Sequence, residues 1–253
     1  MTVVRWIEHP SEPKELLLAW QAPPSVPDRS RWAVGRLWPD GEDTVFDYLQ
    51  AEEFKALNLG RSPDELRAAG YSGYPAFDVR KRPAGGYREH VLEAFLRRLP
   101  PATRSDFPAY LAHYYIERHT PLSAFALLAV TEARLPSDGF SLIDPLDASV
   151  GWVDLVFEVV GFWRFIPGDV CIEPGDPLTL EPDSSHPVAP QAVQVKTSGH
   201  TIGYVNRLQA GTIRTWLAQR SVSCWIARLN GLPASPRAYA FLQVRPAERS
   251  IAA

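Results

Sequence analysis

The stretch QAVQVKTSGHTIGYVNRLQA at residues 191–210 decides the interpretation of the C-terminal half of this 253-residue chain. It contains two apolar runs that alternate with polar residues, at 192–197 and 201–205, and Gly199 lies between them. Alternation with a period of two predicts strands, and a short connection that contains glycine predicts a hairpin. The pattern then changes and predicts a helix at 207–220. The stretch therefore predicts two paired strands followed by a helix.

The rest of this half predicts further short strands. β-branched and aromatic residues, which are typical of strands, are frequent at 152–165, and further short strands are expected at 176–183, 222–231 and 238–246. Gly203 stands inside a predicted strand, where a glycine indicates close packing. Many short strands with one helix favour a small β-barrel or a β-sandwich. Of the two, we expect a small, OB-like β-barrel domain with one helix at residues 149–253.

Residues 1–148 predict a different architecture. A strand is expected at 14–23, and the Pro-Asp-Gly turn within 30–49 predicts a hairpin. Ser62 and Glu65 have the spacing of a capping box. Further helices are expected at 51–59, 87–100, 104–121 and 122–135, and turn residues interrupt the pattern at 136–151. We expect an α+β fold overall, with an N-terminal mixed α/β lobe that contains a small antiparallel sheet and helices.

The composition is that of a globular protein, with 45% hydrophobic and 22% charged residues. The net charge of −3 excludes a global basic field that attracts nucleic acid. No secretory signal opens the sequence, so we expect a cytoplasmic protein with Cys171 and Cys224 reduced, a disulfide between them being the less favoured alternative. No apolar run approaches the length of a membrane span.

Three segments of the C-terminal half follow one another in an informative order. They are VVGFWRF at 159–165, GDPLTLEPDSSHPVAPQAVQV at 175–195 and GHTIGYVNRLQA at 199–210. The last is similar to the signature Gly-x-x-Ile-Gly-Tyr-Val-Pro-Arg of the HIRAN domain, a small β-barrel module of some DNA-repair helicases and bacterial proteins. Residues 155–246 resemble that family as a whole. Since some HIRAN domains recognise single-stranded DNA ends, the resemblance implies a nucleic-acid-binding function.

Aromatic faces stack on bases and basic side chains meet phosphates, so the resemblance implies a set of candidate contacts. They are Trp163, Arg164, Phe165, His186, Lys196, Tyr204 and Arg207. The alternative is that the aromatic residues of this set form barrel core or rim, and that the arginines are solvated side chains or members of surface ion pairs.

The chain departs from the family pattern in the loop before the second strand. The family has an aromatic and an acidic residue where this chain has Val188 and Ala189, and it has Asn where this chain has Gln191. The side chains of Val188 and Ala189 form no hydrogen bonds. These departures put recognition of a strand end in question and leave nucleic-acid affinity as the expectation.

The first half shows a second resemblance. RWAVGRLWPDGEDTVFDYLQAEEFKAL at 31–57 and GYPAFDVRKRPAGGYREHVLEAFLRRLPP at 73–101 are similar to the N-terminal lobe of HipA-type kinases. In that family the lobe contacts the cognate antitoxin, and it also exists as a separate small protein in three-component toxin–antitoxin systems. The kinase motifs themselves are absent from the sequence. The resemblance therefore implies a non-catalytic lobe that contacts a protein partner.

Catalytic and metal chemistry have little support in the sequence. His90 with Glu93 and His113 with Glu117 have helical spacing, but such pairs are far more often surface neighbours than metal ligands. No serine stands in a nucleophile-elbow context. We expect neither an enzyme nor a cofactor or metal.

Two functions remain open. The first is a non-catalytic protein that binds single-stranded or end-bearing DNA through the C-terminal domain, with the N-terminal domain contacting a protein partner in bacterial toxin–antitoxin control, phage defence or DNA repair. The alternative is a protein-interaction subunit without DNA binding, an antitoxin-like partner of a separate HipA-type kinase.

Overall fold

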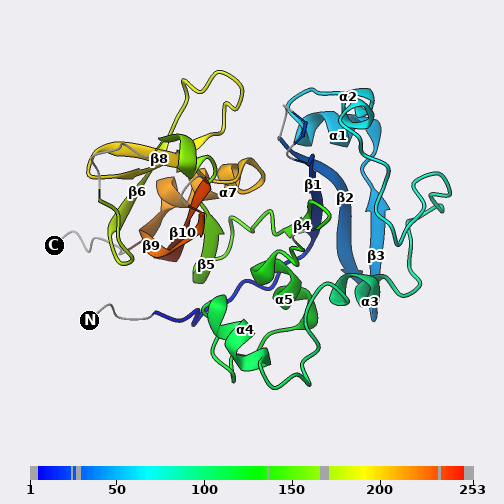
Figure 1. Cartoon of the computed structure of the whole chain (residues 1–253), viewed down its shortest axis with the longest axis horizontal. Coiled ribbons are helices and arrows are strands. Elements are labelled where there is room, and N and C mark those ends of the chain that lie inside the picture. Colours follow the sequence, from blue (N-terminus) through cyan, green and yellow to red (C-terminus); the bar gives the residue numbers. More distant parts are fainter. Residues whose placement is uncertain are drawn as a thin grey trace. The chain divides into compact units, whose positions relative to one another are not determined.

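The computed structural model describes residues 5–23, 25–26, 30–135, 137–165, 171–232 and 235–247. The chain divides into two compact units, whose elements are labelled in Figure 1. The N-terminal unit consists of Glu12–Phe107 and Pro121–Pro145, and the C-terminal unit consists of Met1–Ser11, Pro108–Thr120 and Leu146–Ala253. The division into compact units does not test whether residues 1–148 and 149–253 are separate domains. These domain boundaries therefore stay a prediction.

The N-terminal unit is built on a four-stranded antiparallel sheet in the order β3-β2-β1-β4. Its strands are β1 (Leu16–Gln21), β2 (Arg31–Asp40), β3 (Asp43–Tyr48) and β4 (Phe140–Ile143). The predicted hairpin is confirmed, because Asp40 pairs with Asp43 and Gly41 turns the chain with a φ of 65°. We expected turns where β4 lies, since an apolar run of four residues is too short to show a period.

The helices of this unit are α1 (Ala51–Leu57), α2 (Pro63–Ala68), α3 (Val91–Leu96) and α5 (Ala124–Thr131). The capping box of α2 is confirmed: the Ser62 hydroxyl accepts from the Glu65 N–H at 3.3 Å, and the Ser62 N–H donates to Glu65 Oε2 at 2.7 Å. The helix predicted at 87–100 is reduced to α3, because His90 before it has a left-handed φ of 54°.

Phe46 of β3 lies at the centre of the aromatic core of the N-terminal unit. Its ring centroid is 4.9 Å from that of Tyr48, 5.0 Å from that of Phe77 and 5.7 Å from that of Phe95. Gly35 of β2 faces the same ring, and a Cβ atom there would lie 2.5 Å from Phe46 Cε2. The glycine is therefore required because the ring occupies the place of a side chain.

The C-terminal unit contains a six-stranded sheet in the order β5-β10-β9-β6-β7-β8. Its strands are β5 (Val153–Glu158), β6 (Pro177–Pro182), β7 (Val193–Thr197), β8 (His200–Tyr204), β9 (Arg220–Leu232) and β10 (Ser235–Pro246). Every pairing in this sheet is antiparallel. The strand–turn–strand–helix unit predicted at 191–210 is confirmed as β7, β8 and the following α7 (Arg207–Gln219).

The prediction of a closed β-barrel is wrong. A barrel requires a continuous hydrogen-bond ladder around its circumference. Here β5 and β8 form the two edges of the sheet, and the chain after β5 meets β8 at one isolated bridge, between Val160 and Tyr204. The Val160 N–H donates to the Tyr204 carbonyl at 2.8 Å, and the reverse bond is 2.9 Å. Among the described residues, this bridge is the one ladder contact between the two edges, and the sheet stays open.

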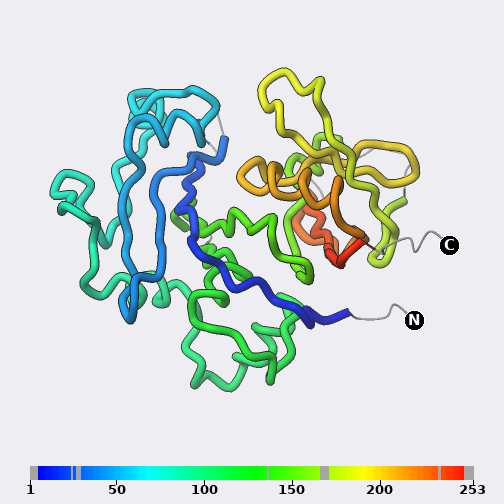
Figure 2. The backbone as a smooth tube through the Cα atoms, turned by 180° about the vertical axis from the view of Figure 1, so that it is seen from behind, coloured from blue at the N-terminus to red at the C-terminus, as the bar shows by residue number. Residues whose placement is uncertain are grey.

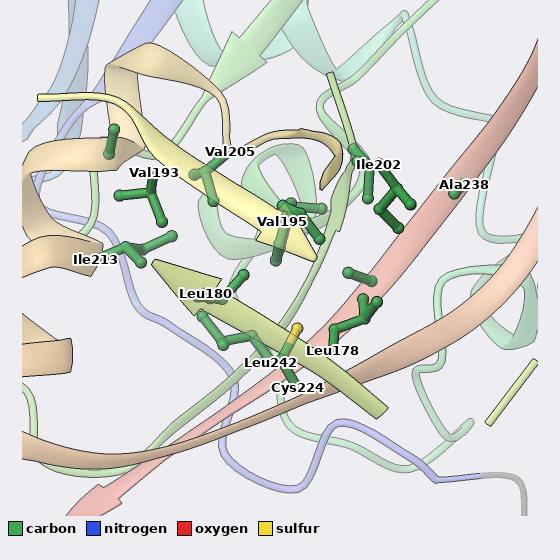
Figure 3. Close-up of a cluster of buried hydrophobic side chains, with 14 of the residues drawn as sticks. Leu178, Leu180, Val193, Val195, Ile202, Val205, Ile213, Cys224, Ala238 and Leu242 are labelled. Atoms are coloured by element: carbon green, nitrogen blue, oxygen red, sulfur yellow. The ribbon is translucent and has the colours of Figure 1, made fainter. Parts of the chain in front are cut away.

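The core of this unit lies between the inward face of the sheet and α7. Alternate residues of β6 and β7 point inward, and Figure 3 shows Leu178, Leu180, Val193 and Val195 converging with Ile213 of α7. Asn206 caps α7 by accepting a hydrogen bond from the Leu208 N–H at 3.1 Å. The alternation predicted for the 192–197 run is thus used to bury one side of the hairpin.

Two segments distant in sequence complete the C-terminal unit. Residues 5–11 and Pro108–Thr120, which include α4 (Phe107–His113) except its first residue, belong to it, and Figure 2 follows both along the backbone. The buried carboxylate of Asp154 accepts from the N–H groups of Glu8 and His9, each at 3.0 Å, and from Arg245 Nη2 at 2.7 Å. The N-terminal residues therefore cover the edge strand β5.

The helix predicted at 104–121 is limited to α4, and the left-handed φ of 61° at Tyr115 prevents its continuation. A bilayer-spanning helix needs about 20 apolar residues. The described part of the chain has no helix of that kind.

Candidate nucleic-acid interface

The segment 159–165 supplies three of the predicted contacts, in a different conformation from the one expected. We expected a strand through residue 165, but β5 ends at Glu158, and α6 (Phe162–Phe165) follows a left-handed turn at Gly161 with a φ of 79°. A strand alternates its side chains, whereas a short helical turn can expose consecutive ones. Phe162 is buried, and Trp163, Arg164 and Phe165 are exposed.

The exposure of these rings is large for aromatic side chains. Trp163 keeps 53% of its surface in contact with solvent and Phe165 keeps 39%. The Arg164 guanidinium lies 4.7 Å from the Trp163 ring centroid, within the range of a cation–π interaction. Trp163 and Phe165 are therefore not core residues, and their role as nucleic-acid contacts stays a prediction.

The bridge between Val160 and Tyr204 places α6 beside the end of β8. It depends on Gly203, whose φ is 148° and whose Cβ, if present, would lie 2.6 Å from both the Val160 carbonyl oxygen and Val159 Cγ1. The close packing predicted for Gly203 is confirmed, as is the turn at Gly199, where φ is 79°. Gly203 thus allows the backbone before α6 to pack closely against the end of β8, which places α6 beside Tyr204.

Tyr204 is the centre of an aromatic cluster of three predicted contacts. The Phe165 ring meets it edge-on with centroids 5.5 Å apart and an interplanar angle of 68°, and the His186 ring does so at 5.0 Å and 83°. These geometries are favourable for aromatic pairs. The three rings come from α6, from the β6–β7 loop and from β8, so the fold assembles them from distant parts of the sequence.

Asp183, in the β6–β7 loop, supports this cluster through hydrogen bonds. It was not among the residues predicted from the sequence. Its Oδ1 accepts from the Ser185 N–H at 3.0 Å and the Ser185 hydroxyl at 2.7 Å, and its Oδ2 accepts from Gln194 Nε2 at 2.9 Å and the Tyr204 hydroxyl at 3.2 Å. The hydrogen bonds from Ser185 and Gln194 lower the pKa of Asp183 to about 2. The Asp-Ser-Ser run is typical of such a side-chain turn and was the available signal.

His186 is fixed by backbone donors of its own loop. Its Nδ1 accepts from the Ala189 N–H at 3.0 Å and from the Val188 N–H at 3.3 Å. A nitrogen that accepts two such bonds carries no proton, so the proton of the neutral ring is on Nε2. Burial, followed by the bond to Asp183, raises the pKa of the Tyr204 hydroxyl. The Tyr204 hydroxyl is therefore protonated near pH 7 and can donate a hydrogen bond.

The other two basic candidates are placed differently from Arg164. Lys196, on the outward face of β7, forms an ion pair with Glu181 of β6 at 2.7 Å, which neutralises its charge locally. Arg207 is the first residue of α7, three positions after Tyr204, and is half-buried. Arg214, which we did not predict, contacts the carbonyl oxygens of Pro190 and Ala192 at 3.5 Å each and thereby links α7 to the β6–β7 loop.

The remaining sequence candidates do not assemble into a site. His90, which precedes α3, and Glu93 in the first turn of α3 form an exposed contact of 3.0 Å. His113 and Glu117 do not share a helix, because α4 ends at His113. Among the described residues no three histidine, cysteine or acidic side chains are grouped as metal ligands. Cys171 is exposed and Cys224 is buried, and both are free thiols.

Comparison with known proteins identifies the region that contains this surface. Residues 153–243 match the family model of the HIRAN domain. The crystal structure of the HIRAN domain of human HLTF is similar at 15% sequence identity and a TM-score of 0.31, over 36% of this chain and 74% of that chain. No curated protein matches the sequence. The HIRAN resemblance at 155–246 is therefore confirmed for 153–243, while the HipA-like character of the N-terminal half stays a prediction.

Proposed function

We propose that the HIRAN domain at residues 153–243 binds DNA, in single-stranded or end-bearing form, and that it does so without catalysis. HIRAN domains are generally DNA-binding modules, which supports nucleic acid as the ligand. The observation that carries the proposal is the surface formed by the exposed Trp163 and Phe165 together with Arg164, Tyr204 and His186. We call these five residues the aromatic surface.

Stacking suits this surface. Each base that stacks on an aromatic side chain contributes about 1–3 kcal/mol, with little preference for sequence. Bases of a duplex already stack on one another, so unpaired nucleotides are the form of DNA that exposes base faces. Tyr204 is held by its hydrogen bond to Asp183 and by its backbone bridge to Val160, which lowers the conformational entropy that is lost when the surface binds a strand.

Phosphate contacts are expected to be few. Arg164 is exposed beside the Trp163 ring, whereas Lys196 already pairs with Glu181. The chain as a whole carries a net charge of −3. Each phosphate contact to a single strand contributes about −0.7 to the slope of log K against log salt. A slope between about −0.7 and −1.4 is therefore expected, corresponding to one or two contacts.

The N-terminal unit is proposed to have a separate function. As a lobe it contacts a protein partner such as a HipA-type kinase, in toxin–antitoxin control, phage defence or DNA repair. This part of the proposal rests on the sequence resemblance at 31–57 and 73–101. The alternative function is that of a protein-interaction subunit that does not bind DNA. Measuring whether the full chain binds DNA distinguishes the two functions.

The test is a fluorescence-anisotropy titration of the full chain with labelled single-stranded and duplex oligonucleotides of equal length. The Trp163→Ala/Phe165→Ala double variant is expected to weaken single-strand binding by more than about 10-fold, because it removes two stacking faces.

Trp152→Ala is the matched control. Trp152 is also an exposed tryptophan, at 54%, beneath an arginine, with the Arg245 guanidinium 5.2 Å from its ring. It lies at the opposite end of β5 from Val160, on the order of 17 Å along the strand. Equal weakening by the control, or no binding by the wild-type chain at micromolar concentration, contradicts the proposal.

A further inference from the structure

The loop that carries His186 indicates which part of a DNA strand the aromatic surface takes. Resting on the proposed function, we infer that the surface binds an internal stretch of single-stranded DNA and has no requirement for a free strand end. The inference follows from which hydrogen-bonding groups of the loop are already engaged and which face outward.

The carboxylate of Asp183, which contacts the cluster through Tyr204, is fully engaged. A carboxylate offers about four acceptor positions. Those of Asp183 are taken by the Ser185 N–H and hydroxyl, by Gln194 Nε2 and by the Tyr204 hydroxyl, at distances of 2.7–3.2 Å. A terminal hydroxyl needs an acceptor for its proton, and binding to Asp183 would require the loss of one of these four bonds. Asp183 is therefore a support for the rings and not a receptor for a strand end.

The loop backbone is engaged as well. The N–H groups of Val188 and Ala189 both point at His186 Nδ1, and Pro187 and Pro190 have no N–H to offer. The side chains of Val188 and Ala189 form no hydrogen bonds, and Val188 is 61% exposed. The N–H groups and side chains of Val188 and Ala189, where the family has an aromatic and an acidic residue, therefore offer a terminal hydroxyl or phosphate no hydrogen bond.

What faces outward recognises features that every nucleotide has. The rings of Trp163 and Phe165 fit base faces, and the Arg164 guanidinium fits a backbone phosphate. His186 Nε2–H is a single hydrogen-bond donor. None of these groups distinguishes a terminal nucleotide from an internal one, so the affinity for a strand is set by the number of bases it stacks.

The experiment compares one oligonucleotide sequence of about 30 nucleotides, longer than the usual site of 4–16 nucleotides, in three forms. The forms are linear with a 3′-hydroxyl, linear with a 3′-phosphate, and ligated into a circle, each used as a competitor in the anisotropy titration with the full chain. The dissociation constants are expected to agree within about twofold. A circle that competes more than tenfold less well than either linear form overturns the inference and leaves DNA binding intact.

The Asp183→Asn variant supplies an independent arm. If Asp183 supports the rings, the substitution weakens competition by linear and circular DNA by the same factor. If Asp183 instead receives a strand end, linear DNA with a 3′-hydroxyl loses affinity and the circle does not, which overturns the inference. Circular dichroism of the variant checks that it is folded. The failure of all three forms to bind the wild-type chain overturns the proposed function together with this inference.

Discussion

The Tyr204 hydroxyl donates a hydrogen bond of 3.2 Å to Oδ2 of Asp183, which joins the end of β8 to the loop that follows β6. The backbone of Tyr204 simultaneously pairs with Val160 just before α6. One residue thus links all three segments of the aromatic surface. The relationship explains why the surface is ordered even though its parts are distant in sequence, and it leads to specific expectations for substitutions.

Tyr204→Phe removes the hydroxyl and keeps the ring. The variant is expected to lose about 1 kcal/mol of unfolding free energy, because a hydrogen bond to a carboxylate is broken at a half-exposed position. Single-strand affinity is expected to change by less than about threefold, since the stacking face remains. Urea unfolding and anisotropy measure the two quantities. A loss of binding without a loss of stability contradicts this role for the hydroxyl.

The low pKa of Asp183 makes a pH-dependent contribution to stability. Hydrogen bonds hold the pKa at about 2, against an ordinary value of 3.8. A carboxyl group whose pKa is lower in the folded state stabilises the fold above its unfolded value, and this contribution is lost as the pH falls through the folded value. The Tm difference between the wild-type chain and Asp183→Asn is therefore expected to be constant above about pH 5 and to shrink between about pH 4 and pH 2. A difference that persists unchanged at pH 2 speaks against the assignment.

Gly203→Ala tests the junction between α6 and β8. A methyl group at this position meets the Val160 carbonyl oxygen and Val159 Cγ1 at 2.6 Å, so one of the segments has to move. The expected destabilisation is more than about 2 kcal/mol. Gly199→Ala is the control: its φ is 79° but a Cβ there has open space around it, and it is expected to cost about 1 kcal/mol. Equal losses in urea unfolding argue against a tight junction.

Arg164 and Lys196 are expected to differ in their effect on DNA binding. Arg164→Ala removes an exposed guanidinium and is expected to raise the dissociation constant about 3- to 10-fold and to flatten the salt dependence by about one phosphate contact. Lys196→Ala removes a charge that Glu181 already pairs with, and is expected to change affinity by less than about twofold. Titrations at two salt concentrations decide between them, and the reverse ranking refutes this account of the phosphate contacts.

Local sequence patterns were sufficient to predict much of the fold. The alternation and turn glycine of 191–210 predicted β7, β8 and α7, and Ser62 with Glu65 predicted the start of α2. These features depend on interactions between residues a few positions apart. The helix lengths at 87–100 and 104–121 were not predictable in this way, because left-handed residues such as His90 and Tyr115 interrupt patterns that are periodic in sequence.

The candidate site was predictable in part for the same reason. Trp163, Phe165, His186 and Tyr204 were identified by residue type and by resemblance, but their convergence depends on the Val160–Tyr204 bridge between segments more than 40 positions apart. The role of Asp183 depends on Gln194 and Tyr204, which are 11 and 21 positions away. The barrel prediction was wrong for a related reason. Closure of a barrel requires a hydrogen-bond ladder between the edge strands, and a sequence pattern does not show whether those strands meet along their length.

The most direct test of the central claim locates DNA on the protein. A single-stranded oligonucleotide with photoreactive thymine analogues is bound to the full chain, crosslinked by light and mapped by mass spectrometry, with Trp152→Ala and Trp163→Ala/Phe165→Ala chains alongside. We predict crosslinks on Trp163, Phe165 or Tyr204 that persist in the first variant and disappear in the second. Crosslinks confined to the β9–β10 hairpin or to the N-terminal unit would contradict the account.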